Sequence, residues 1–256
     1  MPSLAQGAIP DDNLSYPVLV LRGDGGTGSA FYVNTSTSMY LITAKHVLFD
    51  LKTGNLNSPT ASFLSYPRDP KENGRNMISA DLAMLFKTGE VKPHSTQDVV
   101  IVRIASLKEP VSPGGAKAIS LVTGLTLKEM AESGIVGVGF ENIKKFDEVL
   151  VANSIVVFGY PTSLGLKNIP QLDPLRPLLR NGIVAGANPE KKLIVIDCPL
   201  YPETAAALFL KSRSSGRKYN LRSLALSASL FRSIAGGSKG YHPSRLEALP
   251  TPVMES

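Results

Sequence analysis

Tryptophan is absent from the sequence, and cysteine occurs once, as Cys198, among 256 residues. A single cysteine cannot form an internal disulfide, so a disulfide-stabilised framework is excluded. A membrane-spanning helix needs an apolar run of about eighteen residues, and no run in this sequence comes near that length, which excludes such a span. Residues 1–13 lack a basic segment followed by an apolar one, so no signal peptide is predicted. The sequence does not determine the cellular compartment, and the cytoplasm is the default expectation.

Several kinds of ligand site are also missing from the sequence. The three histidines and the one cysteine show no paired spacing of metal ligands, which argues against zinc. No phosphate-binding loop is present. Residues 134–139 (GIVGVG) resemble a dinucleotide-binding loop only superficially, because the spacing is wrong and no helix is expected to follow. We therefore predict no cofactor and no metal site.

The charge of the chain is concentrated at one end. Hydrophobic residues make up 43% and charged residues 19%, which is typical of globular proteins. Of the net charge of +6, residues 203–256 carry +5, from eight lysines and arginines against three glutamates. The same 54 residues contain ten serines. The composition therefore changes sharply at Pro202, and the length allows one large domain or two smaller ones.

Short strands and turns are predicted up to about residue 202. Residues 29–34 (SAFYVN) and 39–44 (MYLITA) are aromatic and β-branched with a polar turn between them, which indicates a hairpin. Residues 98–104 (DVVIVRI) predict a buried strand. Only residues 127–132 suggest a helix. Further strands are predicted at residues 16–22, 119–122, 155–158, 182–185 and 193–197. This pattern predicts an all-β protein, and the proline-glycine segment at 110–115 divides it into two units.

Two residues are candidates for chemistry. His46 follows an apolar strand, and Asp98 begins the predicted buried strand. A carboxylate at the mouth of such a strand is partly desolvated and needs a partner. It could accept a hydrogen bond from one imidazole nitrogen and leave the other nitrogen facing a cleft. On these residues alone, a surface histidine and a strand-capping aspartate remain the alternatives.

Five segments resemble the trypsin-like (chymotrypsin-fold) serine peptidases, bacterial members included. They are residues 26–31 (GTGSAF), 41–47 (LITAKHV), 98–104 (DVVIVRI), 157–161 (VFGYP) and 194–199 (IVIDCP), in the order that the family has them. The resemblance covers residues 16–202. It implies two six-stranded antiparallel β-barrels, at residues 14–110 and 111–202, with a catalytic cleft between them. It also implies that His46 is the general base and that Asp98 orients it.

The nucleophile motif of this family, Gly-Asn-Ser-Gly-Gly-Pro, is missing. Residues 202–209 read Pro-Glu-Thr-Ala-Ala-Ala-Leu-Phe. The codons CCG GGA AAC AGC GGC GGC CCT GTT encode Pro-Gly-Asn-Ser-Gly-Gly-Pro-Val, and deleting one G gives the sequence observed. By position, Ala205 replaces the serine and Glu203 replaces the glycine whose N–H would complete the oxyanion hole.

A second segment supports this frameshift. The same one-base shift applied to residues 224–233 allows Ile-Gly-Ile-Val-Ser, and the family has a Gly-[Ile/Val]-Val-Ser strand at this point. We therefore interpret residues 203–256 as an out-of-frame, basic, serine- and arginine-rich tail. The second barrel is expected to be incomplete or disordered after residue 202.

The expected function is that of a trypsin-like serine endopeptidase, a hydrolase acting on polypeptides, inactive in this chain because Ala205 replaces the serine. The alternative is a non-catalytic pseudoprotease or a module that binds an extended peptide by strand addition. Residues 211–222 are basic and include Tyr219, which could contact nucleic acid. A solvated, disordered tail explains that composition better, so nucleic-acid binding is disfavoured.

Overall fold

The computed structural model describes residues 14–69, 71–108, 118–160, 170–171, 173–190 and 193–198, together with the backbone of two strands at 207–212 and 220–223. The elements of its first part are β1 (Pro17–Arg22), β2 (Thr27–Asn34), β3 (Ser38–Thr43), α1 (Lys45–Leu48), β4 (Thr60–Ser65), β5 (Asn76–Asp81), α2 (Leu82–Lys87), β6 (Val91–Pro93), β7 (Val100–Lys108), β8 (Ala118–Leu121), β9 (Leu125–Glu129) and β10 (Val138–Gly139). Two 3₁₀ turns (Phe140–Asn142 and Phe146–Glu148) precede β11 (Ser154–Gly159), β12 (Leu178–Asn188), β13 (Leu193–Asp197), β14 (Ala207–Ser212) and β15 (Asn220–Ser223). In this part of the chain, no helix is long and apolar enough to cross a membrane.

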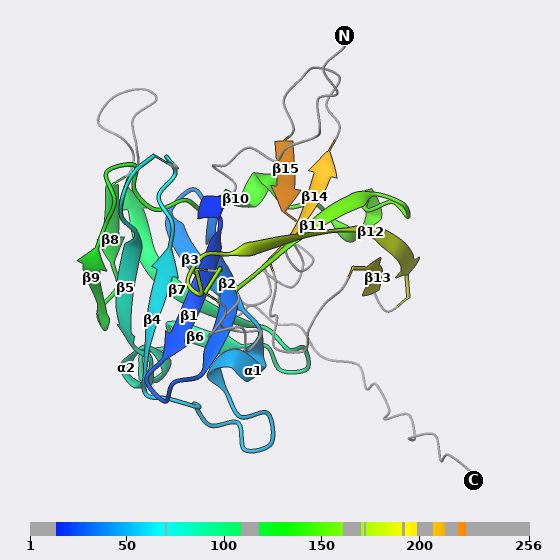
Figure 1. Ribbon diagram of the computed structural model, residues 1–256. Helices are drawn as coiled ribbons and strands as arrows, with labels where there is room; N and C mark the ends of the chain where they lie inside the picture. Colours follow the sequence, from blue (N-terminus) through cyan, green and yellow to red (C-terminus); the bar gives the residue numbers. More distant parts are fainter. Residues whose placement is uncertain are drawn as a thin grey trace.

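Ten strands form a curled sheet in the first part of the chain (Figure 1). Its order is β6-β7-β3-β2-β1-β4-β5-β9, with β10 added to β2 and β8 added to β7. The predicted hairpin is formed by β2 and β3, which pair antiparallel with Tyr32 opposite Leu41. Strand β3 also pairs with β7, so the strand that leads to His46 lies beside the strand that follows Asp98.

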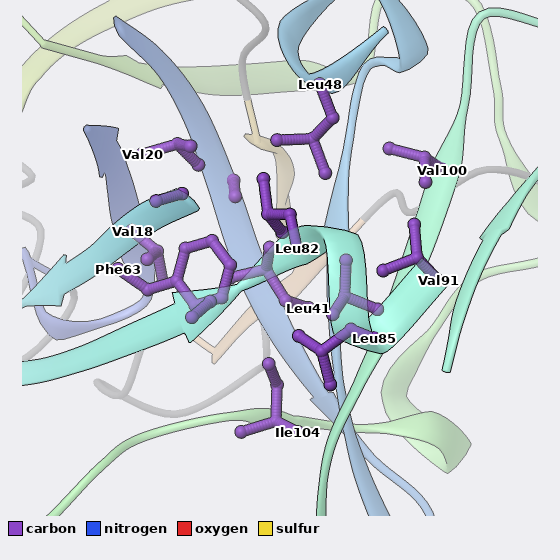
Figure 2. Packing of buried hydrophobic residues seen from close by; sticks show 14 of the residues in the cluster. Val18, Val20, Leu41, Leu48, Phe63, Leu82, Leu85, Val91, Val100 and Ile104 are labelled. Atoms are coloured by element: carbon purple, nitrogen blue, oxygen red, sulfur yellow. The ribbon is translucent and has the colours of Figure 1, made fainter. Parts of the chain in front are cut away.

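The concave side of this sheet encloses the main hydrophobic core. Figure 2 shows side chains from several strands and both helices converging there. Phe63, Leu41 and Leu82 are fully buried at its centre. Burial of each such side chain stabilises the fold by roughly 1.5–3 kcal/mol.

The first part of strand β7 is buried on both faces, which explains the apolar run from Val99 to Val102. Val100, Val102 and Ile104 lie in the main core, whereas Val99 and Ile101 belong to a second cluster on the opposite face. A strand with two buried faces loses the alternation of polar and apolar residues that marks a half-exposed strand.

The second sheet has five strands in the order β13-β12-β11-β14-β15 and lies beside the first (Figure 1). Its strand β11 is also buried on both faces. Val156 and Phe158 pack in the second cluster against residues of the first sheet, while Ile155 and Val157 pack against Val184 of β12. The two sheets therefore share a hydrophobic interface.

A buried tyrosine adds a polar link between the sheets. Tyr160 directly follows β11, is fully buried, and donates a hydrogen bond from its hydroxyl to the carbonyl of Pro17 in β1, at 2.9 Å. Its ring packs against Leu19 and Leu64. The bond satisfies a phenol that would otherwise be buried without a partner.

The predicted all-β class is confirmed, and the strands divide into a curled sheet and a second, smaller one. The helix predicted at residues 127–132 is wrong, because residues 125–129 form β9 and pair with β5. The predicted domain boundaries remain a prediction. Strands β8, β9 and β10 join the first sheet, so strand pairing changes from one sheet to the other between Gly139 and Ser154.

Two strands lie beyond Pro202, in the segment interpreted as out of frame. The backbone of β14 pairs antiparallel with β11, from Ala207 opposite Phe158 to Leu210 opposite Ile155, and β15 pairs with β14. The described parts of this segment therefore extend the second sheet.

Candidate active site

His46 lies on α1, a single helical turn directly after β3. At the end of β3, the Thr43 hydroxyl donates a hydrogen bond to the carbonyl of Ser29, at 2.8 Å. The next residues turn away from the sheet, and Val47 and Leu48 bury their side chains in the core. Burial of these two residues fixes the turn and leaves the His46 side chain 39% exposed.

The C-terminal end of α1 is held by an arginine of β1. Arg22 donates from Nη1 to the carbonyl of Val47, at 2.8 Å, and makes two further bonds to the carboxylate of Asp24, each 2.9 Å. The pKa of Asp24 is lowered, and the hydrogen bonding from Arg22 is the largest cause. A guanidinium beside the last carbonyl groups of a helical turn satisfies an otherwise free acceptor.

Gly28 allows α1 to approach β2 closely. A Cβ atom at this position would lie 2.4 Å from Cγ1 of Val47, the residue that follows His46. Real Cβ atoms do not come so close, so any side chain at this position must displace Val47. The glycine of the GTG segment is thus required by packing against the helix that carries the histidine.

We expect Gly28→Ala to destabilise the fold by about 1–3 kcal/mol, the usual cost of overpacking a core. The variant should unfold at a lower urea concentration than the unaltered chain. Gly186→Ala in β12 is the matched control, because its Cβ would meet Val195 at an ordinary 3.9 Å. Equal midpoints for the two variants would contradict the packing explanation.

Asp98 lies on the loop that precedes β7, and the structure brings it to His46. The backbone N–H of His46 donates to Asp98 Oδ1 at 2.9 Å, and His46 Nδ1 lies 2.6 Å from Asp98 Oδ2. A carboxylate only accepts hydrogen bonds, so Nδ1 carries the proton of a neutral imidazole and Nε2 is left as the acceptor. This is the tautomer that a general base needs.

One further side chain supports His46, and sequence reasoning missed it. Asn57 donates from Nδ2 to the carbonyl of His46, at 3.0 Å. It lies in the loop before β4, eleven residues after the histidine, and no spacing in the sequence links the two. The described residues contain no group of three His, Cys, Asp or Glu side chains that could hold a metal ion.

The remaining site predictions concern the nucleophile. Ala205, at the predicted serine position, and Glu203, at the predicted oxyanion-hole position, lie outside the described residues. Cys198 is described, and burial raises the pKa of its thiol. A thiol with a raised pKa is a weak nucleophile at neutral pH. In the structure, Sγ of Cys198 donates to the carbonyl of Asn181, at 3.7 Å.

No family model matches the chain. No curated protein matches it either. Among solved structures, the chain is similar to Deg5, with 15% identity over 77% of this chain and 75% of that one and a TM-score of 0.45. It is also similar to the thermostable serine protease AL20 from an extremophilic microorganism (11% identity, 87% and 96% covered, TM-score 0.46). A third is the protease Anisep from Arthrobacter nicotinovorans (12% identity, 87% and 95% covered, TM-score 0.36). All three TM-scores lie below 0.5, so we infer the function from the chemistry of the site itself.

Proposed function

We propose that this chain descends from the trypsin-like serine endopeptidases and, as it stands, does not cleave peptide bonds by their mechanism. The observation that carries the proposal is the His46–Asp98 pair, in which both carboxylate oxygens are engaged by one histidine. A surface histidine with no role in catalysis does not need two hydrogen bonds to one carboxylate. The order of the matching segments in the sequence supports the same descent.

In such an enzyme the pair has a defined task. His46 would take a proton at Nε2 from the attacking serine hydroxyl and later return it to the leaving amine. Asp98 would stabilise the imidazolium formed in between. With Ala205 in place of serine there is no hydroxyl to attack and no acyl-enzyme. Glu203 would bring negative charge to the place where backbone N–H groups stabilise an oxyanion.

The test compares the unaltered chain with a frame-restored chain, made by inserting one base after the codon for Pro202. We expect no hydrolysis of fluorogenic casein and no fluorophosphonate labelling by the unaltered chain, and both activities in the frame-restored chain. Returning the restored serine to alanine should abolish both. Turnover by the unaltered chain, or by the single variant Ala205→Ser, would contradict the proposal.

One observation favours the alternative, a non-catalytic module that binds an extended peptide. Strands β14 and β15 extend the second sheet, and a peptide-binding sheet needs an ordered edge strand. Fluorescence anisotropy of labelled, unfolded casein fragments distinguishes the two. Saturable binding by the unaltered chain, together with an inactive frame-restored chain, would favour the binding module.

A further inference from the structure

The loop that carries Asp98 takes its shape from the side chain of His94. The Nδ1 atom of His94 accepts hydrogen bonds from the backbone N–H of Gln97, at 2.9 Å, and from that of Thr96, at 3.2 Å. The ends of the loop are closed by the backbone, since the N–H of His94 donates to the carbonyl of Val99 at 2.8 Å. The imidazole therefore fills the inside of the turn just before Asp98.

The same loop is attached to α1 at two points. Lys45 donates from Nζ to the carbonyl of His94, at 3.3 Å, and the next residue, His46, binds Asp98. One attachment lies at the beginning of the loop and the other near its end. A change in the shape of the loop would therefore move Asp98 relative to a histidine whose own position is fixed by the core.

The contacts of His94 require one protonation state. An imidazole nitrogen accepts a hydrogen bond only while it carries no proton, and both ring nitrogens are donors in the cation. Protonation of His94 would set an N–H group against the N–H groups of Thr96 and Gln97. The bonds to these two N–H groups would be lost, and the Thr96 hydroxyl oxygen, 3.5 Å from Nδ1, is the neighbour that could accept from the new N–H group.

We propose that His94 is a positioning residue for Asp98, and that its protonation releases the loop and weakens the His46–Asp98 pair. The consequence for catalysis rests on the function proposed above, whereas the effect on the pair does not. The chain thus contains a pH-sensitive control of the orientation of its general base.

The electrostatic surroundings give the direction of this control. Burial, and secondly the positive charge of Lys45 on α1, lower the pKa of His94 below its ordinary 6.5. The carboxylate of Asp98 on the same loop is bound to His46. As the pH falls, the unfolded chain binds the proton of His94 before the folded chain does. The contribution of His94 to the free energy of unfolding is therefore fully present above about pH 6.5. It is lost as the pH falls through the lower pKa of the folded state.

The experiment is a long-range ¹H–¹⁵N NMR correlation of the histidine side chains in the full, unaltered chain and its variants. The chain has three histidines, so the His46 Nδ1–H signal is assigned by its loss in His46→Ala. We expect a downfield Nδ1–H signal at pH 7.5 that disappears on acidification. His94→Ala should lack the signal already at pH 7.5.

A second variant separates positioning from general damage. In His94→Asn the amide oxygen can accept the same two N–H groups and does not titrate, so the signal should persist at the acidic pH where the unaltered chain loses it. Gln97→Ala keeps the backbone donor and should behave as the unaltered chain. A normal signal in His94→Ala, or loss of the signal at the same pH in His94→Asn and the unaltered chain, would overturn the proposal.

The two proposals fail separately. The NMR signal reports the pair and needs no nucleophile, so it can respond to His94 in a chain that never cleaves a peptide. A frame-restored chain without activity, combined with a signal that follows His94, would contradict only the proposed function. Absence of the signal from the unaltered chain at pH 7.5 would contradict the pair and, with it, the role of His94.

Discussion

In the frame-restored chain, Asp98→Asn is expected to lower kcat by about 10⁴-fold. Asp98 Oδ2 lies 2.6 Å from His46 Nδ1 and accepts a hydrogen bond from its N–H group. An amide that turned its NH₂ group toward Nδ1 would force the imidazole proton onto Nε2. The histidine could then no longer accept a proton from the serine, and the imidazolium would lose its counter-charge. The loss should appear in kcat measured with a chromogenic peptide at pH 7.5.

The control for this variant is Asp50→Asn in the same frame-restored chain. Asp50 is exposed, and its Oδ1 accepts from the backbone N–H groups of Lys52 and Thr53 in a turn. An asparagine oxygen can accept the same bonds, so kcat should not change. If Asp98→Asn kept most of its activity, the carboxylate would have no part in catalysis and the assignment of the site would fail.

The elements around the site could be predicted because their signals are local. The hairpin of β2 and β3 follows from two β-branched runs and one polar turn. The buried strand after Asp98 follows from a β-branched run that begins at Val99, and β7 confirms it between Val100 and Lys108. His46 follows one such run, and Asp98 precedes another. The sequence therefore predicts that the two side chains can meet, and it leaves a surface histidine and a strand-capping aspartate open as alternatives.

The residues that support the pair could not be predicted in this way. His94, Lys45 and Asn57 all act through backbone groups, which every residue of the chain carries. A contact of this type leaves no pattern in the sequence. Only the fold shows which carbonyl or N–H group lies within reach.

Strands that form by pairing with a distant segment are also difficult to predict from the sequence. Residues 125–129 contain few residues that indicate a strand. The strand forms because β5 has an edge with which β9 can pair. The backbone of β14 similarly pairs with the buried strand β11. The sequence of β14 begins Ala-Leu-Phe-Leu, which is apolar in the frame as it stands. An apolar run can join a sheet whatever its origin, so a change of reading frame at Pro202 does not by itself exclude a strand at residue 207.

The largest expected loss of stability comes from Leu41→Ala. Leu41 is fully buried in β3, with Tyr32 of β2 and Val102 of β7 opposite it on either side. Truncation would leave a cavity between strands that cannot collapse without breaking their pairing. Such a change costs about 2–5 kcal/mol, out of a total of about 5–15 kcal/mol for a domain. Thermal unfolding followed by circular dichroism should show a midpoint lower by roughly 5–15 °C.

Leu51→Ala is the matched control, because it makes the same chemical change at a side chain that is 58% exposed. Its free energy of unfolding should stay within about 0.5 kcal/mol of the unaltered chain. A similar loss in both variants would mean that hydrophobic surface, and not the packing of β3, determines the effect. A loss confined to Leu41→Ala would instead show that the strand leading to His46 is anchored from within the first sheet. The position of His46 would then depend on the same core that holds the fold together.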